Sequence, residues 1–395
     1  MKLIYNIGVR LLYSFIYLAS FFDSKSKAWI NGQKEEINER IHSCIWIHCA
    51  SLGEYKQALP IASLLTQSGH QIIFTFFSPS GFIHAKSEYP TYYLPLDTLG
   101  NAKKFIKKIN PSLAIFVRSE YWYNYIIELD NREIPLVIIN CYLDKDQYFF
   151  KWYAKWFHQK LQSIKYFYAI NNKISQLLTD KGFTNSVLVG DTKVDQVLNV
   201  ENNSNPIRII NENKKIILCA STEKGDHKII ENIIEYFAEE YVLVIVPHEH
   251  THETFDFYNK ISSKDLVKYS NLKNDSATLI YIDVFGVLSS LFKYAWVSYI
   301  GGGFDKGIHN ILESCIVETP MIFGPRYNKF PEAQNLIDAK AAISIDDPMK
   351  ILDALNYFKS KDNYDKATLA CEQYITNNKG ATKSIYNHMK KTGLI

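Results

Sequence analysis

The sequence predicts an α/β protein with two doubly wound, Rossmann-like domains, and three observations support this prediction. Short apolar runs, rich in β-branched and aromatic residues, alternate with segments of helical periodicity along nearly the whole chain. Continuous apolar runs of this kind are typical of strands buried on both faces of a parallel sheet. The 395 residues exceed the usual size of one hydrophobic core. An Asn-rich stretch with one proline, at 199–215, interrupts the alternation and predicts a linker between the domains.

Ten apolar runs mark the expected strands. Those of the first domain are 44–50, 71–77, 113–117, 136–140 and 166–170. Those of the second domain are 215–221, 241–247, 278–283, 295–301 and 319–325. We therefore expect a first domain over 23–198, a second over 206–375 with a cleft between the two, and a C-terminal helix over 376–395 that returns to the first domain.

Composition narrows the class of protein. An apolar fraction of 47% and a charged fraction of 22% describe a folded globular chain rather than a disordered or fibrous one. A net charge of +3 gives no reason to expect nucleic acid as a partner. The six cysteines lack CxxC spacing and most lie in apolar runs, so we predict a reducing compartment and no metal cluster.

The N-terminal residues 1–22 predict a membrane-associated helix. The apolar run from Leu11 to Phe22 is shorter than the roughly 20 residues that a spanning helix needs. Its tyrosines and its flanking basic residues favour a helix that lies in the membrane interface. A signal peptide is disfavoured because no A-x-A-like cleavage site follows. The alternative is a buried first helix of the N-terminal domain.

Ligands of such folds bind at the carboxyl ends of strands, so the residues after each run are candidates for chemistry. In the first domain, Ser51 and Gly53 form a turn, and Glu54 falls at the start of a helix. After a later strand come Arg118 and Glu120. The alternatives are structural: Glu54 as an ordinary first-turn helix residue, and Arg118 with Glu120 as an ion pair.

In the second domain, Ser221, Thr222 and Lys224 follow a strand and suit a phosphate or a carboxylate. A later strand is followed by the histidine run at 248–252, in which the histidines occupy alternate positions. This spacing in an extended loop suits a tetrahedral metal site poorly, so no metal is predicted.

Three glycines, Gly301, Gly302 and Gly303, end another strand and predict a close approach of backbone to a ligand. We expect a helix to open directly after them, with His309 and Asn310 in its first turn and its free N–H groups facing a phosphate. Glu313 is placed to accept the hydroxyls of a ribose. The segment therefore predicts a nucleotide site.

The ordered set ASLGEY, RSEYW, VGDTKVD, CASTEKG, GGGFDKGIHNILE and FGPRYNKFPEA resembles the Kdo transferases, the 3-deoxy-D-manno-oct-2-ulosonic acid transferases of lipopolysaccharide synthesis. The resemblance implies a GT-B fold, CMP-Kdo as donor, and a lipid A precursor (lipid IVA) as acceptor. It also implies a place at the cytoplasmic face of the inner membrane, an anionic surface, and no metal or cofactor. Kdo transfer would proceed with inversion.

The resemblance also implies roles for single residues. Glu54 matches the family's catalytic base, and Glu120 matches a second acidic position. The implied acceptor-binding residues are Ser51, Gly53 and Arg118. The implied donor-binding residues are Lys193, Ser221, Thr222, Lys224, His248, Gly301, Gly302, Gly303, His309, Asn310, Glu313, Asn328 and Glu332.

Two departures from the family concern these contacts. This chain has VPHEH where the family commonly has an arginine and a histidine, so His248 stands where a cation is usual. The segment before RSEYW lacks the Thr-Glu of many relatives.

Two other classes of function compete with Kdo transfer. One is a different GT-B nucleotide-sugar enzyme, such as a UDP-sugar 2-epimerase. The other is a non-catalytic scaffold that binds a sugar nucleotide at a membrane. Neither requires an acceptor-facing base at Glu54.

Overall fold

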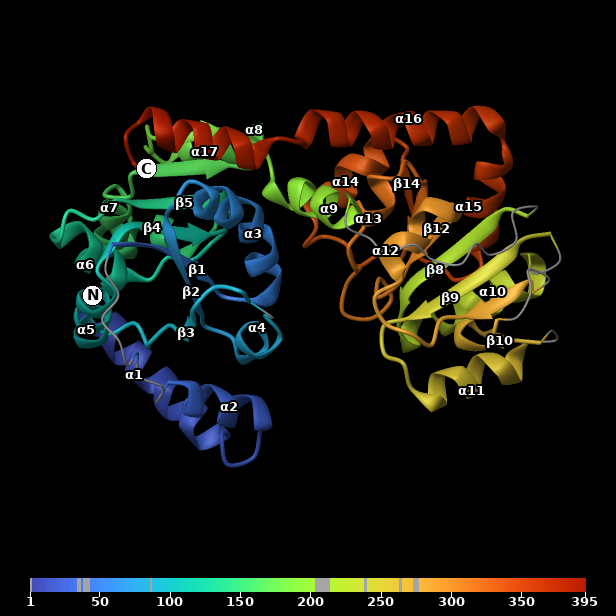
Figure 1. Cartoon of the computed structure of the whole chain (residues 1–395), viewed down its shortest axis with the longest axis horizontal. Coiled ribbons are helices and arrows are strands. Elements are labelled where there is room, and N and C mark those ends of the chain that lie inside the picture. Colours follow the sequence, from blue (N-terminus) through green and yellow to red (C-terminus); the bar gives the residue numbers. More distant parts are fainter. Residues whose placement is uncertain are drawn as a thin grey trace. The chain divides into compact units, whose positions relative to one another are not determined.

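The computed structural model divides into two compact units (Figure 1). The N-terminal unit comprises Met1–Gln196 with Lys379–Ile395, and the C-terminal unit comprises Val197–Asn378. Within the predicted linker, residues 203–213 lie outside the described residues, as does the predicted start of the second domain at 206. The structure describes residues 2–33, 37, 43–85, 87–202, 214–237, 240–262, 265–272 and 277–395.

Seven parallel strands form the sheet of the N-terminal unit, in the order β3-β2-β1-β4-β5-β6-β7. All five predicted runs lie in strands. The two strands that the sequence pattern missed, β3 and β7, are three residues long, too short to show a period. The strands are β1 Cys44–Cys49, β2 Gln71–Phe76, β3 Thr91–Tyr93, β4 Pro111–Val117, β5 Leu136–Cys141, β6 Tyr166–Ala169 and β7 Ser186–Leu188.

Helices cover both faces of this sheet. One face packs on α3 and on α17, which comes from the C-terminal end of the chain, and the other packs on α5, α6, α7 and α8. The helices are α1 Lys2–Ala19, α2 Ser24–Gly32, α3 Leu52–Gln67, α4 Pro79–His84, α5 Leu99–Ile109, α6 Tyr123–Asn131, η1 Tyr148–Phe150, η2 Trp152–Ala154, α7 Lys155–Leu161, α8 Asn172–Asp180, α9 Thr192–Asn202 and α17 Ala381–Lys391.

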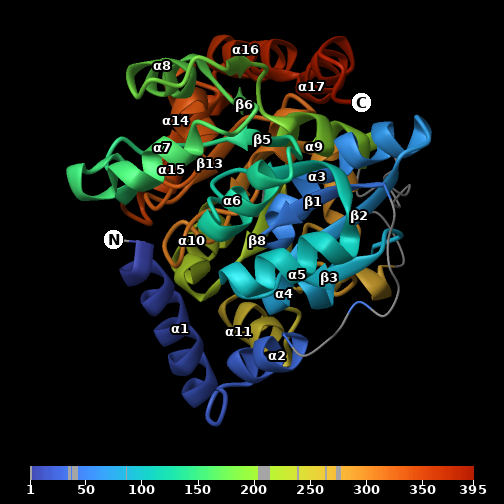
Figure 2. The same ribbon diagram turned by 90° about the vertical axis from the view of Figure 1, so that its left-hand side faces the viewer.

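The first helix, α1, lies at the edge of the N-terminal unit, with α2 folded beside it (Figures 1 and 2). Tyr5 anchors it, because the Tyr5 hydroxyl donates to the buried Asp97 carboxylate and the ring packs against α6 and α7. None of the described helices is long and apolar enough to cross a membrane.

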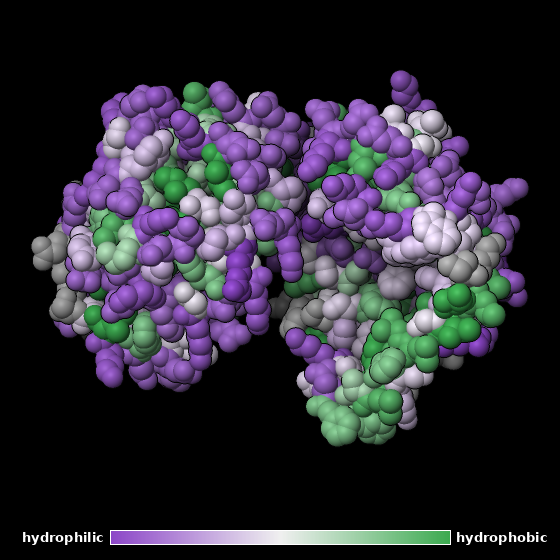
Figure 3. Space-filling view, turned by 180° about the vertical axis from the view of Figure 1, so that it is seen from behind, coloured by the Kyte–Doolittle hydropathy of each residue, from purple (hydrophilic) through white to green (hydrophobic). Residues whose placement is uncertain are grey.

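Much of α1 is exposed and apolar, with Phe15 70% and Leu18 60% exposed. Seen from behind, hydrophobic atoms gather where α1 and α2 lie, at the lower right of Figure 3. The alternative prediction, a buried first helix, is therefore wrong. The hydrogen bond of Tyr5 anchors the first part of α1 to the unit, and most of the large apolar side chains of α1 are exposed.

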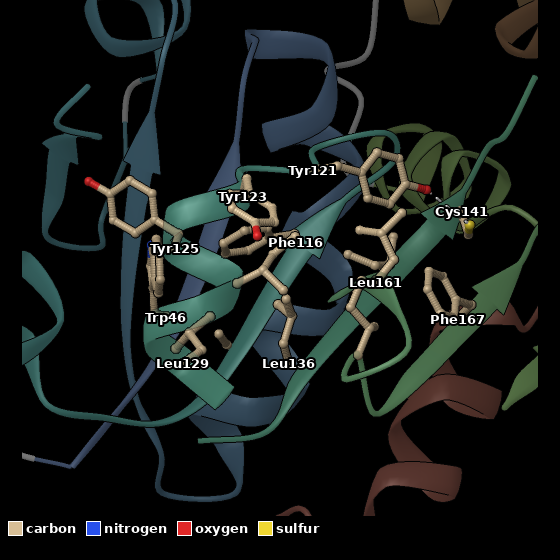
Figure 4. Close-up of a cluster of buried hydrophobic side chains, with 14 of the residues drawn as sticks. Trp46, Phe116, Tyr121, Tyr123, Tyr125, Leu129, Leu136, Cys141, Leu161 and Phe167 are labelled. Atoms are coloured by element: carbon tan, nitrogen blue, oxygen red, sulfur yellow. Dashed lines mark hydrogen bonds between the residues drawn. The ribbon is translucent and has the colours of Figure 1, made fainter. Parts of the chain in front are cut away.

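Aromatic side chains dominate the core on the α5–α8 face of the sheet (Figure 4). Trp46 of β1 packs edge-on against Phe116 of β4, with ring centroids 5.0 Å apart. The Trp46 indole N–H donates to the Thr75 hydroxyl at 2.8 Å, so this large side chain is buried without an unpaired donor. The strand ends that carry the candidate catalytic residues therefore rest on a rigid layer.

The C-terminal unit repeats the architecture, with seven parallel strands in the order β10-β11-β9-β8-β12-β13-β14. All five predicted runs again contain strands, and the missed strands β10 and β14 have two and three residues. The strands are β8 Ile216–Thr222, β9 Val242–Pro247, β10 Val267–Lys268, β11 Leu279–Tyr281, β12 Ala295–Ile300, β13 Met321–Phe323 and β14 Ala342–Ser344. The helices are η3 Lys224–Asp226, α10 His227–Phe237, α11 His252–Ile261, η4 Tyr269–Asn271, α12 Leu288–Leu291, η5 Phe292–Tyr294, α13 Leu312–Cys315, α14 Pro331–Asp338, α15 Lys350–Lys359 and α16 Lys361–Asn378.

Each sheet has a point at which the strand order reverses. In the N-terminal unit β1 pairs with both β2 and β4, and in the C-terminal unit β8 pairs with both β9 and β12. The connections leave in opposite directions at such a point, which opens a crevice beyond the carboxyl ends of the strands where ligands of α/β folds bind. The candidate residues after β1 and β4, and those after β8 and β12, flank these two points.

Candidate active site

Glu54 lies at the third position of α3, directly beyond the carboxyl end of β1. The Ser51 amide donates to Glu54 Oε2 at 2.9 Å, and Ser51 Oγ accepts the Glu54 amide, so the two residues form a reciprocal helix cap. Glu54 therefore does have the structural role of a first-turn residue that caps the helix. The carboxylate is nevertheless half-buried rather than enclosed, and an oxygen that accepts one amide still has lone-pair capacity for a ligand.

The surroundings of Glu54 favour its protonated form. Burial is the main cause that raises its pKa, and the negative charge of Glu120 raises it further. Beside this carboxyl, a Cβ placed on Gly53 would meet only Ser51 Oγ, at 3.8 Å, so the helix start is open above Gly53. The arrangement supplies a carboxylate with an increased affinity for protons next to open space.

A fully buried histidine that the sequence analysis missed, His48, connects the two acidic residues to the core. Its Nδ1 lies 2.9 Å from the Thr75 hydroxyl, and the Trp122 indole N–H donates to its Nε2 at 2.9 Å. Because Nε2 accepts this hydrogen bond, we assign the neutral ring with its proton on Nδ1. Glu120 Oε2 lies 3.6 Å from the same Nε2, and we therefore interpret this contact as a polar contact rather than as an ion pair.

Arg118 does not form the structural ion pair with Glu120 that was considered, as far as the described residues extend. Its guanidinium lies over the Tyr142 ring, 5.6 Å from the centroid. Its backbone has φ 71°, a left-handed conformation that is costly for a side chain of this size. The Arg118 amide donates to Ile139 O at 2.8 Å, which holds this strained strand end in place.

Lys193 lies in α9, within the N-terminal unit, whereas the other predicted donor-binding residues lie in the C-terminal unit. The Lys193 amide donates to Asp191 Oδ1 at 2.8 Å. The preceding residue, Thr192, is buried; its hydroxyl donates to Gln57 O at 2.6 Å and accepts from Asn140 at 2.7 Å. The start of α9 is thus fixed to α3 and to the end of β5.

In the C-terminal unit, the three glycines are required by the protein's own packing. A Cβ on Gly301 would lie 2.4 Å from Ser221 O, and one on Gly303 would lie 2.6 Å from Gly324. Gly302 has φ 87°, and a Cβ there would lie 2.5 Å from Gly307 O. The closely approaching atoms belong to neighbouring loops, so the protein's own packing accounts for these glycines, and their contact with a ligand stays a prediction.

The prediction that a helix starts at 307–310 is wrong. His309 and Asn310 precede α13, which begins at Leu312 and has four residues. The Ile308 amide donates to Arg326 O, and the His309 amide donates to Gly301 O, so both groups already have partners within the protein. Gly307, with φ 131°, turns the chain back toward the glycines instead of starting a helix.

A buried carboxyl that the sequence analysis missed, Asp226, organises this loop. It accepts the Tyr299 hydroxyl at 2.7 Å, the Gly302 amide at 2.8 Å and the Glu223 amide at 2.8 Å. Burial raises its pKa above the usual range, and these hydrogen bonds oppose that shift. Asp226 thereby links the ends of β8 and β12, and it makes the loop geometry depend on a single side chain.

The residues after β8 differ in exposure. Ser221 has φ 52° and is half-buried, and Thr222 is buried with its hydroxyl 3.5 Å from the Tyr258 hydroxyl. Lys224 is exposed and forms an ion pair with Glu253 at 3.2 Å. The predicted set of small donors and one cation is thus present, with the cation on a mobile side chain at the surface.

Three side chains meet beyond the ends of β8, β9 and β12. His309 Nε2 lies 3.0 Å from Glu223 Oε1, and the His248 ring stacks on the His309 ring with centroids 4.4 Å apart. Glu223 is a further residue that the sequence analysis did not select. By contrast, His250 packs on the Phe285 ring, 4.3 Å between centroids, so the histidine run does not converge as a unit.

Asn310 and Glu313 form a pair, with Asn310 Nδ2 donating to Glu313 Oε1 at 3.0 Å. Ser289 donates to Glu313 Oε2 at 2.8 Å, so both oxygens are oriented before any ligand arrives. Of the last two predicted residues, Asn328 is exposed, and Glu332 is buried in the first turn of α14.

Comparisons with known proteins agree with this architecture. A family model described as 3-deoxy-D-manno-octulosonic-acid transferase (kdotransferase) matches residues 25–196. The 3-deoxy-D-manno-octulosonic acid transferase of Rickettsia felis is 28% identical over 366 residues, covering 88% of this chain and 77% of the relative.

Two solved structures share the fold. The UDP-GlcNAc 2-epimerase of Neisseria meningitidis superposes with a TM-score of 0.63 at 13% identity, covering 89% of this chain and 100% of that one. MurG of Acinetobacter baumannii superposes with a TM-score of 0.59 at 13% identity, covering 89% of this chain and 99% of that one. At this identity the likeness concerns the fold alone, and it confirms the predicted two-domain GT-B class.

Proposed function

We propose that the chain is a 3-deoxy-D-manno-octulosonic acid (Kdo) transferase, and that it moves Kdo from CMP-Kdo to a lipid A precursor, lipid IVA, in lipopolysaccharide synthesis. The observation that carries the proposal is Glu54, an open carboxyl with a raised pKa at the point where the strand order of its sheet reverses. This is the position that the sequence motif assigns to the catalytic base of a glycosyltransferase.

Glu54 supplies the general base that activates the acceptor hydroxyl. A sugar hydroxyl is a poor nucleophile, and a carboxylate within hydrogen-bond reach takes its proton as the attack proceeds. The acceptor oxygen forms a bond to the anomeric carbon of Kdo, the bond from that carbon to the phosphate oxygen breaks, and its electron pair leaves with CMP. Attack opposite to the leaving group inverts the anomeric centre. A raised pKa makes the Glu54 carboxylate a better proton acceptor.

Other groups in the N-terminal unit position the acceptor under this proposal. Arg118 carries a half-exposed cation that suits a phosphate of the lipid A precursor. Glu120 lies two residues further along the chain, after the left-handed backbone at Arg118. Ser51 and Gly53 form the open turn beside Glu54.

On the donor side, we assign the CMP-Kdo contacts to the ends of β8, β9 and β12. The Thr222 and Ser221 hydroxyls, with the cation of Lys224, suit the phosphate, and the Asn310–Glu313 pair suits the ribose hydroxyls. Lys193, Asn328 and Glu332 complete the set by their match to the family motifs. The proposed reaction needs no cofactor and no metal ion, since charge on the departing phosphate is met by hydroxyl donors and a cation.

We also place the protein at the cytoplasmic face of the inner membrane. The support is α1, whose large apolar side chains are mostly exposed while its anchor, the half-buried Tyr5, bonds to Asp97 of the N-terminal unit. A helix with an open apolar face and flanking basic residues lies in the interface of an anionic membrane, where the acceptor lipid is also found.

The mass of the lipid product tests the proposed reaction. The purified full-length protein is incubated with lipid IVA and with CMP-Kdo generated in situ, and the lipid is analysed by mass spectrometry. We expect an increase of one or more Kdo units that requires both substrates. A lipid of unchanged mass, with nucleotide binding intact, would refute the reaction; interconversion of a UDP-sugar by the same protein would favour the epimerase alternative, and binding without turnover would favour the scaffold.

A further inference from the structure

Glu223, His248 and His309 bring one carboxylate and two imidazoles together beyond the sheet of the C-terminal unit. One ligating atom from each residue lies within 4.8 Å of the other two. One of these contacts, from His309 Nε2 to Glu223 Oε1, is 3.0 Å. The cluster combines residues from three separate strand ends, so it has no signature in the sequence.

The backbones that carry these side chains are fixed. The Glu223 amide donates to Asp226 Oδ2 at 2.8 Å, and the Glu223 carboxylate accepts the Asp226 amide. The His309 amide donates to Gly301 O at 3.1 Å, and the His248 amide donates to the carbonyl oxygen of Thr222, the last residue of β8, at 2.9 Å. Hydrogen bonds from the surrounding shell orient the carboxylate, as they do for carboxylates that bind metal ions.

This ligand set matches the chemistry of zinc. Two histidines and one glutamate bind Zn²⁺ in sites that keep a fourth position open. With ligand distances of about 2.0–2.1 Å and tetrahedral angles, the ligand atoms of such a site lie roughly 3.3–3.5 Å apart. The cluster is compatible with this spacing, since one pair of ligand atoms is 3.0 Å apart and every pair is within 4.8 Å.

An ion from solvent can reach the cluster. His248 is exposed, and the side chains of Glu223 and His309 are 22% and 24% exposed. A small rotation of the exposed His248 side chain closes the longer distances without moving the backbone.

We propose that Glu223, His248 and His309 form a binding site for Zn²⁺, with a solvent molecule as the fourth ligand. The site differs from the histidine run considered in the sequence, because it uses His248 but neither His250 nor His252. The cluster lies at the strand ends to which we assign CMP-Kdo, but its test is independent of the transfer reaction, because metal binding is measured without any sugar substrate.

Titration of the untagged, full-length, chelator-treated protein with Co²⁺ tests the site. Tetrahedral Co²⁺ absorbs visible light, and Zn²⁺ displaces it from a shared site. We expect saturable binding of one Co²⁺ per chain, reversed by Zn²⁺. The six cysteines are buried and do not compete for the ion.

Substitutions identify the ligands. We expect His248→Ala and Glu223→Gln each to weaken binding at least about tenfold. His248 is exposed, so its loss leaves the fold intact, and glutamine at 223 keeps an oxygen that accepts the Asp226 amide. His252→Ala, at an exposed histidine at the start of α11, is the matched control and should bind as the unchanged protein does. Absence of saturable binding, or equally tight binding by His248→Ala, would overturn the proposal.

Discussion

Glu54 caps α3 through Ser51 and also lies in the field of the Glu120 carboxylate. The helix cap fixes the position of the Glu54 side chain, while burial and, after it, the charge of Glu120 raise its pKa. His48 is neutral by its hydrogen bonds and lies between the acidic residues and the core. The site therefore holds two carboxylates with no fully charged partner among the contacts described, which is an arrangement suited to proton transfer.

The raised pKa of Glu54 predicts the acid side of the pH profile. A base acts only when ionised, so kcat/KM falls as the pH decreases through the pKa of Glu54, and the midpoint lies above the usual range of a glutamate. Glu120→Gln removes one cause of the shift and should move this midpoint to lower pH, whatever its effect on the maximal rate. If kcat/KM falls with the same midpoint pH in Glu120→Gln and in the unchanged protein, Glu54 does not control the acid side of the profile.

The glycines offer a second prediction about single residues. Gly302 and Gly286 have nearly the same φ, 87° and 85°, but only a Cβ at Gly302 would meet another atom within 4 Å. Gly286→Ala should therefore cost about 1–2 kcal/mol of unfolding free energy, from backbone strain alone. Gly302→Ala adds a collision with Gly307 O and should cost about 3–5 kcal/mol. Chemical denaturation measures both; equal losses would contradict the packing role of Gly302.

Among the elements, α1 is held by a polar anchor at Tyr5 and by the packing of Val9 and Ile16 on a small hydrophobic cluster, while most of its large apolar side chains are exposed. The bond from Tyr5 to Asp97 satisfies a carboxyl that is fully buried. Removing the whole helix would leave that carboxyl without this partner and destabilise the unit. Substitutions on the exposed face are a cleaner test of membrane contact than a deletion.

Phe15→Asp with Leu18→Asp should abolish binding to vesicles that contain anionic phospholipid. Both side chains are exposed, so the change removes apolar area from the membrane contact and adds negative charge without disturbing the core. Leu369→Asp is the matched control, because Leu369 is a 51% exposed leucine on α16. Vesicle sedimentation that persists in the double variant would place the membrane contact elsewhere.

Over the whole molecule, the sequence predicted the two sheets well because buried parallel strands are continuous apolar runs, such as 113–117 and 241–247. It missed edge strands of two or three residues, since these show no period. The helix expected at 307–310 failed because the loop is held by bonds to Gly301 and Arg326, which no local pattern reveals.

The candidate site likewise contains residues that the sequence predicted and residues that it missed. Glu54 and Glu120 were found because each follows a recognisable strand end within a motif. His48, Asp226 and Glu223 were missed because their roles depend on contacts with residues far along the chain, such as Trp122 and Tyr299. Local signals thus selected the motif residues at the strand ends, while the supporting network of contacts required the fold.

The most direct test of the central claim compares Glu54→Gln with the unchanged protein. Glutamine keeps the helix cap with Ser51 but cannot take a proton, so stability and fold are retained while the base is lost. We predict that binding of CMP is unchanged and that Kdo transfer to lipid IVA, followed by product mass, falls by about 10²–10⁴-fold. Transfer at the normal rate by Glu54→Gln would contradict the account and remove Glu54 from the mechanism.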